Sequence, residues 1–509
     1  MNLFLRRNAP VFYMLLAMIV LYAPWMGRGY VNLEYPFSMA ARGLSDSRFA
    51  DQLDVYFGVQ ANPLGYSFVL AAIYKIFGYH DWFWLAKLPS LCGALMIIVS
   101  GWMLTRDRWH GRRSLFYFWS SLIILHPMII AFGTSATPDV LPVGLLMLSL
   151  AIAFKSADDQ ISRKFVAALL FGLAIIVKYN SAYFGLAFIY IAVFRENRVK
   201  RSSGHIRRDI AIFALVPFAI LASYIVWSNA RYGVFISNRF ARHKPNFLDG
   251  AVWAFTFGKY LSFIGIFIGF IPILIIAKQS RTIFERLKCV VVIIATLLFG
   301  WLVLCRKTIG EMNFGYAFGS LDLRMLETFG LISGVCFCLY ALKQVANRDR
   351  LSQLLICGLA PYLLLVSASL PTQRYLIFAV PVVSLLVVDA LKIFSTRARD
   401  LCVGITVLGF AAVSLLGASY LRAQGNASEN MAVWMKNRNL LGQTAAFPIA
   451  IHAGQHFFRI QGIETKYEVV QTTIDGEKLI KEKILHREPM NVLGKITRVY
   501  VLRELPKTP

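Results

Sequence analysis

The chain has 509 residues, of which 57% are hydrophobic, and its mean hydropathy is +0.59. A soluble fold of this length carries a smaller apolar share, so the composition indicates an integral membrane protein. Lys and Arg (53) outnumber Asp and Glu (27), which gives a formal net charge of +26. The positive residues fall mainly in short gaps between apolar runs, so the charge indicates membrane topology and no nucleic-acid partner.

About thirteen apolar runs are expected to cross the membrane as helices, several of them shorter than the ~20 residues that a spanning helix needs. The first follows Arg6 and Arg7 and has no small-residue cleavage site after it, so we expect an anchor that starts in the cytoplasm. The runs are 10–26, 82–104, 115–132, 141–154, 165–177, 183–194, 210–227, 261–276, 290–304, 329–342, 354–370, 376–391 and 402–421.

Loops rich in Lys and Arg alternate with loops that are poor in them. Insertion and the membrane potential hold such clusters in the cytoplasm. These inner loops begin near Arg106, Lys155, Arg195, Lys278, Lys343 and Lys392. By alternation, the outer face carries 31–78, 134–140, 178–180, 230–255, 306–324, 369–374 and the tail after 421. The acids and bases that topology leaves unexplained all lie on this outer face.

The first outer loop, residues 31–78, is our hypothesis for the active site, because a long polar loop after one span is typical of a functional loop. It opens with Glu34 and continues into an amphipathic helix over 37–44. An acidic cluster and the run Gln-Ala-Asn-Pro-Leu-Gly-Tyr follow, which supply Asp46, Asp51, Asp54, Asn62 and Tyr66.

Two further outer features carry single charges at the mouths of spans. Asp139 follows Ala-Thr-Pro and precedes an apolar run, so it is either a helix N-cap or a functional carboxylate, and the two roles are compatible. Lys178 lies between two apolar runs on the face that is poor in cations. It either extends to the membrane interface or binds phosphate.

A basic loop on the outer face departs from the general charge bias. It contains Arg239, Arg242, His243 and Lys244. The loop is solvated, contacts anionic lipid headgroups, or neutralises a phosphorylated lipid substrate. Arg374, at another outer span mouth, has the same alternatives.

The run Ala-Lys-Leu-Pro-Ser-Leu-Cys-Gly-Ala-Leu at 86–95 resembles the Arg-Leu-Pro-Ser-x-x-x-Gly signature of polyprenyl-phosphate-dependent membrane glycosyltransferases. These form the GT-C superfamily, in its branch of protein O-mannosyltransferases and bacterial lipid A aminoarabinose transferases. Motifs around Glu34, Asn62-Pro63-Leu64, Thr137-Pro138-Asp139, Gly172-Leu173-Ala174 with Lys178, Arg239-Phe240 and Arg374-Tyr375 are similar to that family's motifs in the same order.

The resemblance covers the first 420 residues and implies a GT-C fold, an all-α membrane protein of thirteen spans with a long first periplasmic loop. Two departures concern charge: Leu33-Glu34 keeps one carboxylate where the family commonly has two, and Ala61-Asn62 replaces a charged or His residue. Because the ligand set is reduced, and because the seven cysteines lie in or beside apolar runs, no metal and no other cofactor is expected.

Transfer of a sugar from a polyprenyl phosphate needs a carboxylate base for the acceptor hydroxyl and cations for the departing phosphate. We expect Glu34 as the base, and Asp139 as a second acid that orients the acceptor or substitutes for it. The expected phosphate and substrate ligands are Lys178, Arg239, Arg242, His243, Lys244, Arg374, Asn62 and Tyr66. A single displacement would invert the anomeric centre. The sequence contains no nucleotide-binding motif, which argues against a cytosolic nucleotide-sugar donor.

After residue 421 the chain becomes polar. A helix over 429–436 and strands at 446–452, 467–472 and 496–502 predict a small α/β periplasmic domain, 422–509, behind a transmembrane catalytic domain, 1–421. The expected protein lies in a bacterial inner membrane with its N-terminus in the cytoplasm. Its acceptor is lipid A, lipopolysaccharide or another envelope glycan. The alternatives are a protein O-glycosyltransferase, a glycan polymerase or ligase, and a transporter or flippase of lipid-linked saccharides.

Overall fold

A computed structural model describes most of the chain. The described residues are 2–31, 34–50, 53, 56–57, 62–78, 83–110, 112–194, 203–233, 249–280, 291, 294, 323–347, 349–368, 373–440, 444–445, 466–472, 474–480 and 482–504.

Among these residues, seven helical runs are long and apolar enough to cross a membrane. The pair α6 (Arg113–Ile124) and α7 (Pro127–Gly133), which bend by 60° where Pro127 starts a new helix, is an eighth run if the two helices are counted as one broken span. The seven are α1 (Asn2–Met26), α5 (Phe83–Thr105), α11 (Ser203–Tyr232), α13 (Gly250–Ile268), α17 (Leu323–Ala346), the run of η4, α19 and η5 (Gln373–Ile393), and α20 (Thr396–Lys436).

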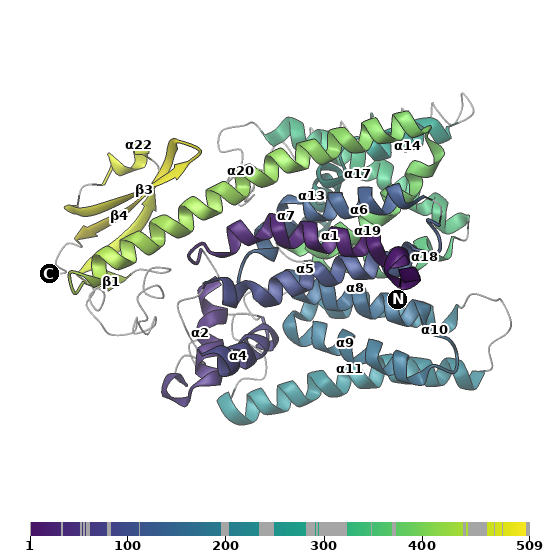
Figure 1. The fold of residues 1–509 in the computed structure, drawn as a ribbon, viewed down its shortest axis with the longest axis horizontal. Coiled ribbons are helices and arrows are strands. Elements are labelled where there is room, and N and C mark those ends of the chain that lie inside the picture. The colour runs from purple at the N-terminus through teal and green to yellow at the C-terminus, as the bar shows by residue number, and fades with distance from the viewer. Residues whose placement is uncertain are drawn as a thin grey trace.

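Shorter helices lie between the long ones along the chain and complete the bundle (Figure 1). Three of them, α2, η1 and α4, belong to the first outer loop. The others in this group are α8, α9, η2, α10, α14 and α18. Their bounds are α2 (Glu34–Ser45), η1 (Ser47–Phe49), α4 (Gly65–Phe77), α8 (Val140–Lys155), α9 (Ile161–Val177), η2 (Tyr179–Phe184), α10 (Gly185–Val193), α14 (Ile271–Gln279) and α18 (Arg350–Val366).

The predicted fold class, a helical multi-pass membrane protein with a small C-terminal sheet, is confirmed. Large apolar side chains such as Leu215, Phe218 and Val226 on α11 are exposed, as expected for a surface that faces lipid and not water. The count of thirteen spans stays a prediction.

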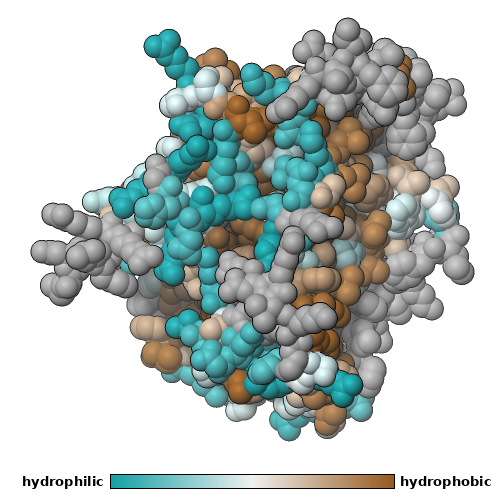
Figure 2. All heavy atoms as spheres, turned by 90° about the vertical axis from the view of Figure 1, so that its right-hand side faces the viewer, coloured by the Kyte–Doolittle hydropathy of each residue, from teal (hydrophilic) through white to brown (hydrophobic). Residues whose placement is uncertain are grey.

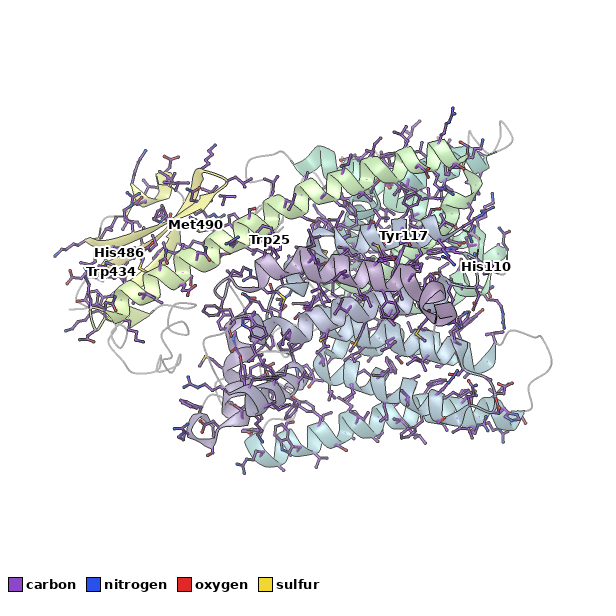
Figure 3. All side chains as sticks on the ribbon, viewed as in Figure 1. Trp25, His110, Tyr117, Trp434, His486 and Met490 are labelled. Carbon is purple, nitrogen blue, oxygen red and sulfur yellow. The ribbon has the colours of Figure 1, made fainter. Side chains whose placement is uncertain are left out.

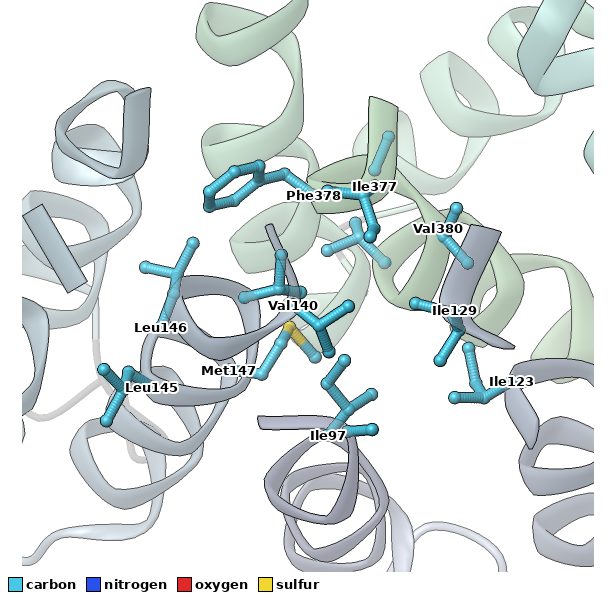
Figure 4. Packing of buried hydrophobic residues seen from close by; sticks show 14 of the residues in the cluster. Ile97, Ile123, Ile129, Val140, Leu145, Leu146, Met147, Ile377, Phe378 and Val380 are labelled. Atoms are coloured by element: carbon cyan, nitrogen blue, oxygen red, sulfur yellow. The ribbon is translucent and has the colours of Figure 1, made fainter. Parts of the chain in front are cut away.

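The core of the bundle lies where α5, α8 and α19 meet. Ile97 of α5, Val140 and Met147 of α8, and Val380 of α19 pack there as buried side chains (Figure 4). The backbones of α5 and α8 approach each other closely, because glycines face one another at the contact. A side-chain carbon added to Gly144 would lie 2.2 Å from the Gly93 carbonyl oxygen. Small residues at such contacts allow helices in membranes to pack by van der Waals attraction.

The last span runs on without a break beyond the expected domain boundary at 421. α20 joins the predicted span 402–421 and the predicted helix 429–436 into one helix of 41 residues. Its C-terminal part packs on the sheet, where Trp434 stacks on His486 with ring centroids 4.0 Å apart (Figure 3). The division into domains 1–421 and 422–509 stays a prediction.

The C-terminal sheet has four strands in the order β1-β2-β4-β3. Predicted strands 467–472 and 496–502 correspond to β2 (Tyr467–Thr472) and β4 (Lys495–Glu504), and 446–452 lies outside the described residues. β1 (Thr444–Ala445) pairs parallel with β2. A helical turn, α22 (Ile474–Glu477), follows β2.

One strand was not predicted from the sequence, β3 (Ile484–Val492), because it contains Pro489 and several charges. It is an edge strand, where proline is tolerated. Leu493 and Gly494, both with positive φ, form the tight turn from β3 to β4.

Replacement of Gly144 by valine is expected to lower the melting temperature of the purified protein, since overpacking a core costs typically ~1–3 kcal/mol. Gly404→Val in α20 is the matched control, because nothing lies within 4 Å of an added carbon there. Equal melting temperatures for the two variants, measured in the same detergent, would contradict the close approach of α5 and α8.

Candidate active site

Four segments that are far apart in the sequence meet at one end of the bundle. They are the start of α2, the turn 134–139 between α7 and α8, the turn at Lys178 between α9 and η2, and the start of η4 at Arg374. In Figure 1 this end carries α2 and the C-terminal sheet, and the N-terminus lies at the opposite end. The alternation of charged loops had placed all four segments on one face, and the structure brings them into contact.

Glu34 is buried and accepts four hydrogen bonds. The Arg28 guanidinium donates from Nη1 to Oε2 over 2.7 Å and from Nη2 to Oε1 over 3.2 Å. Backbone amides fill the remaining positions: Val31 N donates to Oε2 over 2.6 Å and Ala136 N to Oε1 over 2.9 Å. A carboxylate has about four acceptor positions, so this carboxylate is saturated by protein donors.

Arg28 extends the same network to the turn before α8. Its Nη2 also donates to the Thr134 carbonyl over 3.2 Å and to Ser135 Oγ over 2.6 Å. Beside it, the buried Lys87 ammonium donates to the carbonyls of Met26 and Arg28. The sequence analysis missed Arg28. The available signal was a lone cation directly after the first span, on the outer face that is poor in cations.

Asp139 and Lys178 form a second buried ion pair. Lys178 Nζ donates to Asp139 Oδ1 over 2.6 Å, and their side chains are 4% and 3% exposed. Lys178 Nζ also lies 5.4 Å from the ring centroid of Tyr375 and 5.8 Å from that of Phe378. Attraction to an aromatic ring face adds a modest stabilisation to a desolvated cation at such distances.

The structural alternatives weighed for this pair do not fit the geometry. Asp139 occupies the position before α8, but its backbone is helical and its side chain makes no capping hydrogen bond. Lys178 does not extend to the interface, because it is buried. Two buried charges that hold each other at a loop junction are costly to maintain without a further role.

Opposing effects act on the pKa of each carboxyl group. Burial raises the pKa of Glu34, but the Arg28 guanidinium and the Lys87 ammonium lower it further, so it falls below its ordinary value of 4.5. Burial likewise raises the pKa of Asp139, and Lys178 with Arg374 brings it below 3.8. Both groups are therefore carboxylates at neutral pH.

Tyr66 and Asn62 take different places. Tyr66 is fully buried, donates to the Ala86 carbonyl over 2.9 Å and contacts Ser90 Oγ at 3.1 Å. Ser90 in turn donates to the Thr137 carbonyl over 3.1 Å, so Tyr66 supports the turn that carries Asp139. Asn62 is half-buried, and its backbone carbonyl accepts from Tyr56.

The structure thus brings Glu34, Asp139, Lys178 and Arg374 to one place, with Tyr66 joined through Ser90. The basic loop residues lie outside the described part of the chain: Arg239, Arg242, His243 and Lys244. Within the residues that the structure describes, no three His, Cys, Asp or Glu side chains form a group able to hold a metal ion.

Residues 61–227 match the protein family described as dolichyl-phosphate-mannose-protein mannosyltransferase. The match confirms the resemblance. The segment contains the signature at 86–95 as well as Asp139 and Lys178, and the predicted enzyme class, a glycosyltransferase, is confirmed with it. No curated protein matches the chain at a significant level.

Three solved structures are similar to the chain at low identity. ArnT from Cupriavidus metallidurans in the apo state is 16% identical, with 97% of both chains covered and a TM-score of 0.49. The same protein bound to undecaprenyl phosphate is 16% identical, with 97% of this chain and 98% of that chain covered and a TM-score of 0.48. The apo oligosaccharyltransferase of Archaeoglobus fulgidus is 12% identical, with 85% of this chain and 58% of that chain covered and a TM-score of 0.44.

Removal of Arg28 is expected to destabilise the protein strongly, because breaking a buried pair leaves an unpaired charge at a typical cost of ~3–5 kcal/mol. Arg28→Met tests this through the melting temperature. The matched control is Arg48→Met, whose partner Asp46 is held over the same 2.7 Å but whose side chain is 81% exposed. If both variants melt alike, Arg28 does not hold the buried network together.

Proposed function

We propose that the chain is an inverting glycosyltransferase that moves a sugar from a polyprenyl phosphate to an acceptor at the outer face of the membrane. The observation that carries this proposal is the buried pair of Asp139 and Lys178, with Arg374 acting on both. It supplies one carboxylate and two cations at the mouths of spans, where a lipid-linked sugar reaches the protein with its tail still in the bilayer.

The cations provide for the leaving group. As the bond between the anomeric carbon and the phosphate oxygen breaks, negative charge develops on the polyprenyl phosphate. Lys178 and Arg374 stabilise that charge through hydrogen bonds that are strong in a water-poor site. Arg239, Arg242, His243 and Lys244 are further phosphate ligands in this proposal, and Asn62 contacts the substrate beside Tyr66.

The hydrogen bonds favour Asp139 as the base over Glu34, which is the reverse of the order expected from the sequence. A general base needs a lone pair within reach of the acceptor hydroxyl. The four acceptor positions of Glu34 are filled by Arg28, Val31 and Ala136. Asp139 accepts a hydrogen bond from Lys178 at Oδ1. The arriving phosphate attracts the Lys178 ammonium, and this frees the Oδ1 lone pair for the acceptor hydroxyl. Glu34 then acts as a positioning residue that holds the turn 134–136 in front of Asp139.

The orientation we propose puts this site in the periplasm of a bacterial inner membrane and the N-terminus in the cytoplasm. It is supported by the opposite end of the bundle, which carries Arg106, Lys155, Lys164 and Arg350. The sheet and the C-terminal part of α20 lie at the same end as the site in Figure 1. The proposed periplasmic domain, 422–509, is thus placed to meet an acceptor.

The acceptor we propose is lipid A, lipopolysaccharide or another envelope glycan. A protein acceptor is the second candidate, because the matching family is described by the transfer of mannose to protein. Parallel assays with glycolipid and peptide acceptors separate the two.

The decisive experiment follows the transfer of labelled sugar from short-chain polyprenyl-phosphate donors by the purified protein. Loss of a general base lowers the rate typically ~100-fold or more, so Asp139→Asn is expected to lose transfer by at least that factor while it remains folded. Asp46→Asn is the matched control, because Asp46 lies on the same expected outer face but is partly exposed and paired with Arg48.

Glu34→Gln is expected to slow transfer together with a lower melting temperature, since it weakens the buried network. Full transfer by Asp139→Asn, with loss in a stably folded Glu34→Gln, would return the role of base to Glu34. Absence of transfer and of donor binding by the wild type would contradict the proposed function.

A further inference from the structure

A cavity of about 760 Å³ lies at the end of the bundle opposite to the candidate active site. Its walls come from the C-terminal ends of α5, α8 and α10, the N-terminal part of α9, Asp209 of α11 and the start of α18. Because α8 runs from Asp139 to this cavity, the length of a helix separates the two places. The cavity plays no part in the proposed transfer reaction, and the inference below does not rest on that reaction.

The cavity has an excess of positive charge. Five cations and two carboxylates line it, which gives a net charge of +3. Three ion pairs are formed inside this set: Lys155 with Asp107 and the buried Lys164 with Asp209, each over 2.7 Å, and Arg106 with the same Asp107 over 3.5 Å. The remaining cations are Arg163 and Arg350.

Two of these cations have no carboxylate partner. Within the part of the chain that the structure describes, Arg163 donates to the neutral Gln160, and Arg350 forms no ion pair. The carboxylate next to Arg350, Asp349, is held by Arg108 on another loop over 2.5 Å. Among the described residues, carboxylates therefore neutralise Arg106, Lys155 and Lys164 but not Arg163 and Arg350.

The buried pair of Lys164 and Asp209 fixes the geometry of the wall by joining α9 to α11. Tyr190 of α10 donates to Gln353 of α18 over 2.8 Å on the other side. The cations thus project from elements that are tied together, and a ligand does not have to order them first.

Apart from Ser156 and Ser162, the rest of the lining is apolar, and it continues onto the surface that faces lipid. Met103 and Ile152 line the cavity, and so do Val166 and Phe194, which are exposed. Figure 2 looks at this end of the molecule and shows hydrophilic residues over much of the face, with hydrophobic ones beside them. A free inorganic anion would contact only the basic residues of this cavity, whereas an amphiphile would contact both the basic and the apolar residues.

We infer that this cavity binds the phosphate-bearing headgroup of an anionic phospholipid, with an acyl chain along Val166 and Phe194. Arginines bind phosphate oxygens in a bidentate manner, and basic pockets between spans on the cytoplasmic side suit anionic headgroups. Arg163 and Arg350 bind the phosphate, and the paired Lys155 and Lys164 shape the site. The bound lipid holds α9, α10 and α18 together at this end.

The test measures the binding of anionic phospholipid to the full-length protein in zwitterionic nanodiscs doped with phosphatidylglycerol or cardiolipin. Native mass spectrometry detects the bound lipid, and the rise in melting temperature reports the stabilisation that it causes. The wild type is expected to retain anionic lipid in preference to phosphatidylcholine. Arg163→Gln with Arg350→Gln is expected to weaken that binding about thirtyfold, since each cation near an anionic headgroup contributes ~1 kcal/mol.

Arg112→Gln with Arg113→Gln is the matched control: it removes the same charge from exposed positions at the same end, outside the cavity. It is expected to bind as the wild type does. An equal loss in the control would overturn the inference, because binding would follow net charge alone. Competition by inorganic phosphate at comparable concentration, or equal retention of phosphatidylcholine, would overturn it as well. Circular dichroism and gel filtration verify that both double variants are folded.

Discussion

The bidentate ion pair of Arg28 and Glu34 is the constraint on which the outer end of the molecule depends. Arg28 follows the first span, Glu34 starts α2, and the pair is bound to the turn before α8 through Ser135 and Ala136. One buried carboxylate thereby fixes the end of the first span and the start of α2 to a turn that is about a hundred residues further along the chain. Because all of its acceptor positions are used, any shift of one segment leaves a buried donor or charge without a partner, and such loss is expensive in a dry interior.

This fixed frame explains how a reactive pair is held a short distance away. Asp139 follows the bound turn directly, and Lys178 reaches it from the next helical hairpin. Their mutual attraction keeps both ionised in a buried place, where water does not compete for them. A negatively charged ligand that attracts Lys178 releases the Asp139 carboxylate at the same moment. In the proposed mechanism, this arrangement couples the arrival of a phosphate to the exposure of a base.

Much of this end of the molecule could be predicted from the sequence because its charges are rare and their positions are set by topology. Lys178 was noticed as a cation on a face that is poor in cations, and Arg374 as a further cation at an outer span mouth. Glu34 and Asp139 were noticed as carboxylates in an outer loop and at a span mouth, and alternation of the loops placed all four on one face. The partner of each charge could not be predicted. Arg28 lies 106 residues from the Thr134 carbonyl that it binds, and the buried role of Tyr66 depends on a hydrogen bond to a different helix. Such pairings follow from packing and not from local pattern.

The fold shows the same limit. Apolar periodicity predicted the spans, but not that the last span and the following amphipathic segment form one continuous α20. A local change in polarity was interpreted as a boundary, although the helix passes from lipid to the surface of the sheet without a break. β3 was missed because Pro489 argues against a strand, and its place at the edge of the sheet, where proline is tolerated, is known only from the pairing order.

The proposed active site requires Lys178 to be a ligand of phosphate and not only the partner of Asp139. The most direct measurement is the dissociation constant of a short-chain polyprenyl phosphate for the wild type and for Lys178→Gln, together with the melting temperature of each. A charged hydrogen bond to phosphate is worth ~1.5–3 kcal/mol, so we predict that the substitution weakens binding at least about tenfold in a folded protein. Unchanged affinity in the folded variant would show that the phosphate binds elsewhere and would contradict the proposed site.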